Sequence, residues 1–112
     1  MVSSVVHIGC GAGFSGDRVD AAIPVVATLA KKEGPKYLIF ETLAERTLAL
    51  AQKHRRKDPS HGYSPFLESY IRPILKKCHE SGIKIVSNFG AANPKGGAIK
   101  IAEIAKETGC KD

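Results

Sequence analysis

Three short apolar runs, separated by helical patterns, most constrain what this chain can fold into. They occupy residues 4–8 (SVVHI), 37–40 (YLIF) and 83–88 (IKIVSN). Each run is continuous rather than alternating, which is typical of strands buried on both faces of a parallel sheet. Strands that alternate with helices form βαβ units. We therefore predict an α/β fold with a short, mostly parallel three-stranded sheet flanked by helices, in the order β-α-β-α-α-β-α.

The helices between these runs have recognisable start and stop residues. Asp17 is placed as the N-cap of the first helix, and Thr42 with Glu45 has the spacing of a capping box. Prolines favour helix starts or bends, and a glycine after the last apolar position is typical of a helix end. These rules predict further boundaries and bends at Pro24, Gly34, Pro65, Pro73, Gly82, Asn93 and Gly109.

Length and composition fit a single α/β domain over residues 1–112. Hydrophobic residues make up 43% of the chain and charged residues 25%, as in a soluble globular protein. No apolar run approaches the ~20 residues of a membrane span. The first residues have neither the basic nor the long apolar stretch of a signal peptide. We therefore expect a cytoplasmic protein that does not enter a membrane.

The cysteines and the basic charge exclude two further classes of site. Cys10, Cys78 and Cys110 are too widely spaced for a zinc framework and fit reduced thiols, and no histidines have metal-ligand spacing, so we expect no metal. The net charge of +6 suggests nucleic acid, but its one dense cluster, residues 53–57 (KHRRK), falls at a predicted helix end and lacks interleaved aromatic residues. We favour a solvated helix end over a nucleic-acid patch.

The predicted sheet looks incomplete. The last helix is predicted to run to about Thr108, with Gly109 after it, where a chain normally turns back to the sheet, and only three residues follow. Three parallel strands leave two free edges and a poorly covered face. We therefore expect the front part of a larger α/β fold, or a chain that self-associates or takes a partner strand to complete its sheet.

The loops after the strands carry the candidate functional residues. Ligands of parallel α/β sheets bind beyond the carboxyl ends of the strands. Glu41, at the end of the second strand, is a candidate general acid or base with a raised pKa, and Glu45 is a second candidate whose simpler role is the capping box. The candidate substrate- or anion-binding residues are Gly11, Gly13, Ser15, Gly16, Asp17, Arg18, Arg46, Asn88, Gly90, Asn93 and Lys95.

The first loop also suggests a dinucleotide site. Gly11-x-Gly13-x-x-Gly16 has the form of the fingerprint, and Glu41 could hold a ribose hydroxyl. The strand, however, is predicted to end at Ile8, which would place the fingerprint two residues earlier and put a phenylalanine where its third glycine belongs. The Asp17 carboxylate would also oppose a pyrophosphate at the helix start. NAD(P) is therefore disfavoured.

Three motifs give a more specific reading. Residues 11–18 (GAGFSGDR), 38–47 (LIFETLAERT) and 86–94 (VSNFGAANP) resemble the acyclic terpene utilisation family, and the chain resembles the N-terminal part of these longer proteins. The resemblance implies an enzyme of catabolism, of lyase, hydratase or isomerase type, that acts on a branched organic acid or acyl-CoA. It supports Glu41 as the proton-transfer group, Arg18 and Arg46 as anion holders, and the Gly-rich loop with Asn88 as the substrate cradle.

Two alternatives remain beside this leading hypothesis. One is a dinucleotide-binding, Rossmann-like domain of an oxidoreductase. The other is a non-enzymatic assembly module that presents a sheet edge to a partner chain.

Overall fold

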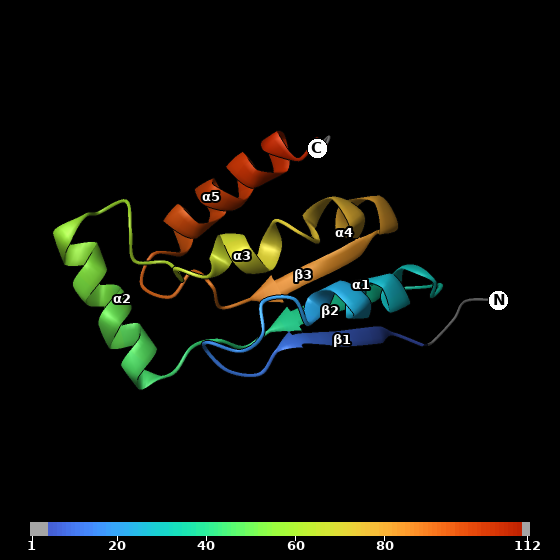
Figure 1. Ribbon diagram of the computed structural model, residues 1–112, viewed down its shortest axis with the longest axis horizontal. Coiled ribbons are helices and arrows are strands. Elements are labelled where there is room, and N and C mark those ends of the chain that lie inside the picture. Colours follow the sequence, from blue (N-terminus) through green and yellow to red (C-terminus); the bar gives the residue numbers. More distant parts are fainter. Residues whose placement is uncertain (1–4, 111–112) are drawn as a thin grey trace.

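A computed structural model describes residues 5–110 and confirms the predicted α/β class and order of elements (Figure 1). The predicted helix after residue 64 is divided into two near Pro73. The elements are β1 (His7–Ala12), α1 (Ala22–Ala30), β2 (Lys36–Phe40), α2 (Glu45–Lys57), α3 (Leu67–Ile71), α4 (Leu75–Ser81), β3 (Ile83–Ser87) and α5 (Pro94–Glu107).

The three strands form one parallel sheet in the order β1-β2-β3. Ile8 pairs with Tyr37, which in turn pairs with Lys84, and the β1 register shifts between Cys10 and Ala12. All three carboxyl ends therefore lie at the same end of the sheet. The loops after β1, β2 and β3 are brought together there, as the topology requires.

Strand β1 lies further along the chain than predicted. It begins at His7 and continues through the glycines to Ala12, so Gly11 is a strand residue and not a loop residue; Ser4 lies outside the described residues. Glycine is needed because a Cβ at Gly9 would stand 2.5 Å from Val25 Cγ1, and one at Gly11 would collide with the Phe40 ring. Close packing, rather than a turn, explains these two glycines.

Two of the predicted helix caps are wrong. Helix α1 begins at Ala22 and has no side-chain cap, so Asp17 lies five residues before the helix. Helix α2 begins at Glu45, and the Thr47 hydroxyl accepts a 2.6 Å hydrogen bond from the Ala44 N–H. Asp17 and Thr42 are instead used within their own loops, as described below. Local spacing could not show that these side chains have competing partners.

The caps at the end of α4 and at the start of α5 are confirmed. Gly82 ends α4 with a φ of 68°, a left-handed conformation that glycine adopts without strain. Asn93 Oδ1 accepts a 2.9 Å hydrogen bond from the Gly96 N–H and caps α5, with Pro94 in the first turn. Helix α5 then ends at Glu107, one residue before the predicted end.

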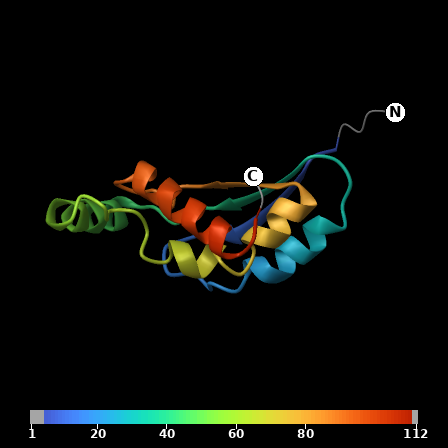
Figure 2. The same cartoon turned by 90° about the horizontal axis from the view of Figure 1, so that it is seen from above.

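The helices cover only one face of the sheet (Figure 2). Helix α1 packs on β1 and helix α4 on β3. On the opposite face, Ile8 is 66% exposed, Ile39 39% and Val86 56%. The prediction of burial on both faces is therefore wrong. The order β1-β2-β3 explains it, because right-handed crossovers that always step in the same direction place their helices on the same face.

An aromatic cluster forms the core next to the carboxyl ends of the strands. Phe40 lies 4.9 Å from Phe89 and 5.6 Å from Tyr70, measured between ring centroids. Tyr70 and Phe89 are stacked at 5.2 Å, and all three side chains are buried. The cluster ties α3, β2 and the loop after β3 together. It thereby supports the loops that surround the candidate site.

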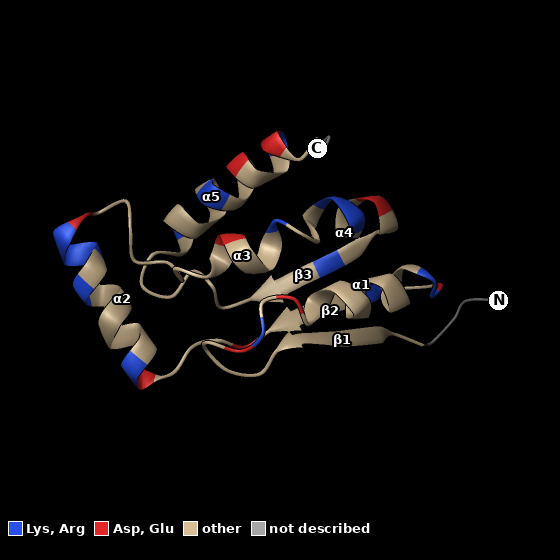
Figure 3. Cartoon of the chain, viewed as in Figure 1, with Lys and Arg blue, Asp and Glu red and all other residues tan. Residues whose placement is uncertain are grey.

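Helix α2 stands away from the sheet (Figure 1). Of its residues, only Ala51 is buried. Arg55 Nη1 donates a 2.9 Å hydrogen bond to the Ala92 carbonyl and holds the helix to the loop before α5. The Lys and Arg residues of α2 gather toward its C-terminal end (Figure 3), where cations face the negative end of the helix dipole.

Candidate functional site

A pocket of about 120 Å³ lies beyond the carboxyl ends of the strands, between α2 and the loops that follow β1, β2 and β3. One part of its wall is apolar and consists of Leu43, Leu50, Ala51, Pro65, Phe66 and Ala91. The other part offers hydrogen-bonding groups from Ser15, Thr42, Thr47, His54, Ser64 and Asn88. This lining, apolar with a few polar groups, resembles that of small-molecule sites, and the volume suits only a small group of atoms. We call it the strand-end pocket.

Thr42 and Asn88 line the polar end of the strand-end pocket, and Glu41, which does not line it, is bonded to Asn88 from behind. Asn88 Nδ2 donates to Glu41 Oε1 at 2.8 Å, and Asn88 Oδ1 accepts from the Thr42 N–H at 2.9 Å. Glu41 Oε1 also accepts from the Leu43 N–H at 3.0 Å. These bonds fix the Asn88 amide between the ends of β2 and β3. The predicted pair of Glu41 and Asn88 is thus brought together.

The environment of Glu41 favours its ionised form. The Leu43 N–H, and after it the Asn88 amide, lowers the pKa of the Glu41 carboxyl below its usual range. The expected raised pKa is therefore wrong, because the side chain is exposed and accepts hydrogen bonds instead of being buried. A carboxylate of this kind can accept a proton, but it is a poor donor near neutral pH.

The loop after β1 is held by Asp17. Its carboxylate accepts hydrogen bonds from the N–H groups of Gly13 at 3.0 Å and Arg18 at 2.8 Å, in that order the main causes of its lowered pKa. The buried Tyr70 hydroxyl donates a 2.7 Å hydrogen bond to the Asp17 carbonyl. Together these contacts close the loop and place Ser15 on the wall of the strand-end pocket. Gly16 allows the turn with a φ of 89°.

A comparison with protein-family models matches residues 6–112 to the acyclic terpene utilisation family protein AtuA. The chain belongs to this family. The resemblance noted from the three motifs is confirmed, and the match extends over nearly the whole chain. No curated protein and no solved structure matches the chain.

The predicted anion holders of this AtuA-family chain do not reach the strand-end pocket. The Arg18 guanidinium makes two 2.9 Å hydrogen bonds to Asp20, and its side chain is 75% exposed. Glu45 and Arg46 are exposed in the first turn of α2 and are not among the residues that line the pocket.

Three other candidates lie on the α5 side of the fold. Gly90 packs against Pro94, where a Cβ would stand 2.6 Å from Pro94 Cα. Asn93 is 9% exposed and caps α5, while its Nδ2 donates to the carbonyls of Pro59 and His61. Lys95 borders a separate surface hollow with Asn93. These residues are therefore structural or belong to other surfaces of the AtuA-family chain.

Sequence reasoning missed the part of the pocket that α2 and the start of α3 supply. In the sequence, His54 stands out only as part of the basic cluster of residues 53–57, and no motif marks Leu50 or Phe66. Thr47, Leu50 and His54 recur at three- and four-residue spacing, which places them on one face of a helix. That pattern was present in the sequence, but the packing of this face over the strand ends could not be read from it.

The loop geometry differs from that of a dinucleotide-binding turn. In the fingerprint, the helix begins directly at the glycine loop and its N-terminus holds the pyrophosphate. Here α1 begins six residues after Gly16, and the Gly13 N–H is already bonded to Asp17. Within residues 5–110, no group of three or more His, Cys, Asp and Glu side chains is placed to hold a metal ion. None of the helices described is long and apolar enough to cross a membrane.

Proposed function

We propose that this chain binds a branched organic acid, or the acyl group of a CoA thioester, in the strand-end pocket, as part of a cytoplasmic enzyme of acyclic terpene catabolism. The observation that carries the proposal is the pocket itself. Its apolar wall suits a short hydrocarbon chain, and its volume of about 120 Å³ corresponds to roughly four water molecules at ~30 Å³ each. Family membership supports the metabolic context.

Glu41 is the proposed proton-transfer group, and it acts as a base. Its ionised carboxylate lies 2.8 Å from the Asn88 amide, which lines the pocket. A base at this position suits proton abstraction during an isomerase, hydratase or lyase reaction. Glu41→Gln keeps the size of the side chain and removes the charge. In the complete enzyme this variant is expected to lose most of its activity, and full activity would remove Glu41 from the chemistry.

Ligand binding is tested by thermal unfolding in the presence of 3-methylbutanoate, free CoA, a branched acyl-CoA and NAD(P)H. A ligand at 100 times its dissociation constant stabilises a protein by about 2.7 kcal/mol. We expect the branched acid or acyl-CoA to raise the melting temperature, and Leu50→Gln to reduce that effect. A response to NAD(P)H alone would favour the dinucleotide-binding alternative.

A role in assembly is the second proposal, because the sheet offers two apolar surfaces. The open face exposes Ile8, Ile39 and Val86. The edge of β3 borders an apolar groove of about 410 Å³ between Ile85 and Ile101 of α5. We propose that a partner strand, or a second copy of the chain, completes the sheet at the edge of β3. A monomer at high concentration by light scattering would contradict self-association.

A further inference from the structure

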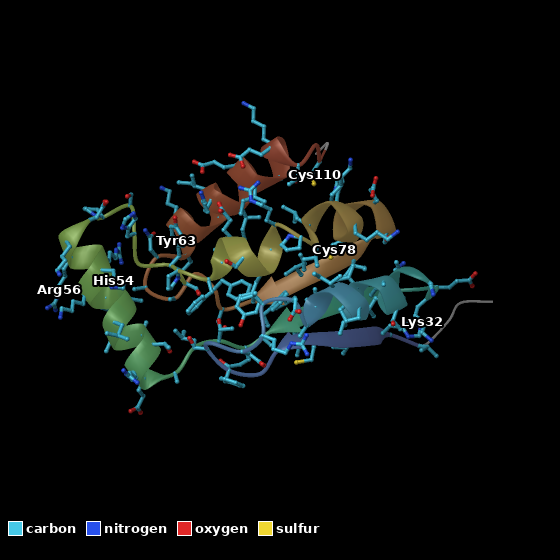
Figure 4. The ribbon with its side chains drawn as sticks, viewed as in Figure 1. Lys32, His54, Arg56, Tyr63, Cys78 and Cys110 are labelled. Carbon is cyan, nitrogen blue, oxygen red and sulfur yellow. The ribbon has the colours of Figure 1, made fainter. Side chains whose placement is uncertain are left out.

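A second cavity adjoins the strand-end pocket and differs from it in chemistry. Its volume is about 320 Å³, and it shares His54, Ser64 and Pro65 with the strand-end pocket. Its other walls include Tyr63 and Lys100. Figure 4 shows His54 on α2 and Tyr63 on the segment between α2 and α3. We call this second space the polar cavity.

Hydrogen-bond donors dominate the polar cavity. Lys100 brings an ammonium group, Tyr63 and Ser64 bring hydroxyls, and His54 and His61 bring imidazoles. Each of these side chains can donate to an oxygen of a ligand. By contrast, the apolar wall of the strand-end pocket offers no such groups. A molecule that reaches across the shared wall therefore meets hydrocarbon at one end and donors at the other.

Among the described residues, Glu68 is the one carboxylate on the wall of the polar cavity, and two cations pair with it. Its Oε1 lies 3.1 Å from Lys100 Nζ and 3.2 Å from Arg72 Nη2. The hydrogen bond from Lys100, followed by that from Arg72, lowers the pKa of the Glu68 carboxyl. Arg72 also pairs with Glu107 at 2.6 Å. Lys100 Nζ also lies 3.8 Å from Glu103 Oε2, and Glu103 does not line the polar cavity. Glu68 thus positions Lys100 at the wall of the cavity.

The walls of the polar cavity are fixed by main-chain hydrogen bonds. The Ala92 N–H donates to the Gly62 carbonyl at 2.9 Å, and the Ser64 N–H donates to the Phe89 carbonyl at 2.7 Å. Asn93 Nδ2 donates to the His61 carbonyl at 2.9 Å. The segment that carries the donors is therefore anchored to the loop before α5. A site that is ordered before binding loses less entropy when the ligand arrives.

We propose that the polar cavity binds the carboxylate end of a short branched monocarboxylate whose hydrocarbon end occupies the strand-end pocket, with Lys100 as the main anion holder and His54 between the two ends. This inference rests on the proposed function of the strand-end pocket and adds the position and chemistry of the head group. It assigns to Lys100 the role that Arg18 and Arg46 were predicted to have.

Two probes of similar shape separate the head group from the hydrocarbon. We expect the chain to bind 3-methylbutanoate about tenfold more tightly than the neutral 3-methylbutan-1-ol, as measured by calorimetry, because one charge-assisted hydrogen bond contributes about this much. Lys100→Gln is expected to remove this preference by weakening the binding of the acid more than that of the alcohol. Lys77→Gln, on the exposed side of α4, is the matched control and keeps the preference.

A second measurement uses the unaltered chain, so that it does not depend on how a variant folds. The imidazole proton signals of His54 and His61 are expected to shift when 3-methylbutanoate is added, whereas the signal of His7 stays in place. Binding of both probes with equal affinity, insensitive to Lys100→Gln, would overturn the head-group site and leave the strand-end pocket standing. No binding of either probe would overturn both proposals.

Discussion

Replacing Asn93 with alanine tests how the walls of the two cavities are held. The side chain is 9% exposed and makes three hydrogen bonds within the fold. Oδ1 accepts from the Gly96 N–H at 2.9 Å, and Nδ2 donates to the carbonyls of Pro59 at 3.1 Å and His61 at 2.9 Å. One amide thus caps α5 and anchors the segment between α2 and α3.

The expected loss of stability follows from these three bonds. Removing an N-terminal cap costs about 1 kcal/mol. Each carbonyl that loses its donor contributes about 1 kcal/mol more. Asn93→Ala is therefore expected to lower the free energy of unfolding by about 3 kcal/mol. Asn93→Asp keeps the cap but turns a carboxylate toward the carbonyls of Pro59 and His61, so it restores at most the first of these contributions.

Urea unfolding followed by far-ultraviolet circular dichroism measures the effect. The denaturation midpoint is expected to fall at an unchanged slope, since the surface exposed on unfolding stays the same. Gln52→Ala, an exposed substitution in α2, is the control and is expected to stay within about 0.5 kcal/mol of the unaltered chain. A loss below about 1 kcal/mol for Asn93→Ala would refute the reasoning, because the cap alone accounts for that much.

Three further predictions concern packing, thiol reactivity and pH. Gly11→Ala is expected to cost about 1–3 kcal/mol in urea unfolding, because the new Cβ meets an aromatic ring, while Gly13→Ala, where a Cβ meets nothing, is nearly neutral. At pH 8 a thiol reagent is expected to modify the exposed Cys10 within the folded chain and to spare Cys78, whose pKa burial raises to about 11; equal rates would contradict this. Glu68 has a lowered pKa when folded, so its stabilising effect is complete above the ordinary carboxyl pKa of about 4.3 and is lost as the pH falls through the lower folded value. The urea midpoint of Glu68→Gln should therefore depend less on pH between about pH 5 and 3 than that of the unaltered chain.

Features that depend on neighbours along the chain could be predicted from the sequence. The cap at Asn93 and the helix end at Gly82 need only a few consecutive residues, and both are confirmed. The alternation of apolar runs and helices also predicted the parallel sheet correctly. In each case the interaction that decides the structure lies within one turn or one element.

Features decided by distant partners could not be predicted in the same way. Thr42 has the spacing of a capping residue, but its N–H donates to Asn88, 46 residues away. Asp17 likewise accepts hydrogen bonds within its own loop, and its main-chain carbonyl accepts one from Tyr70 of α3. The glycines of β1 looked like a loop because Val25 and Phe40, which make glycine necessary, are remote in sequence.

The candidate site was predicted in part for the same reason. Ser15 and Asn88 follow strands, so the topology alone brings them together at the strand ends. His54 and Leu50 belong to a helix that touches the sheet very little, and no rule of topology places such a helix. Its position depends on the contact between Arg55 and Ala92, which joins two segments 37 residues apart.

Because one face of the sheet is apolar and exposed, the solubility of the chain should depend on temperature and salt. Apolar association weakens on cooling and strengthens in sulfate or phosphate, which are excluded from protein surfaces. Solutions of this chain should therefore become turbid on warming or in sulfate and clear again when cooled or diluted. A lysine in place of Val86, on the exposed face of the edge strand β3, should keep them clear under both conditions.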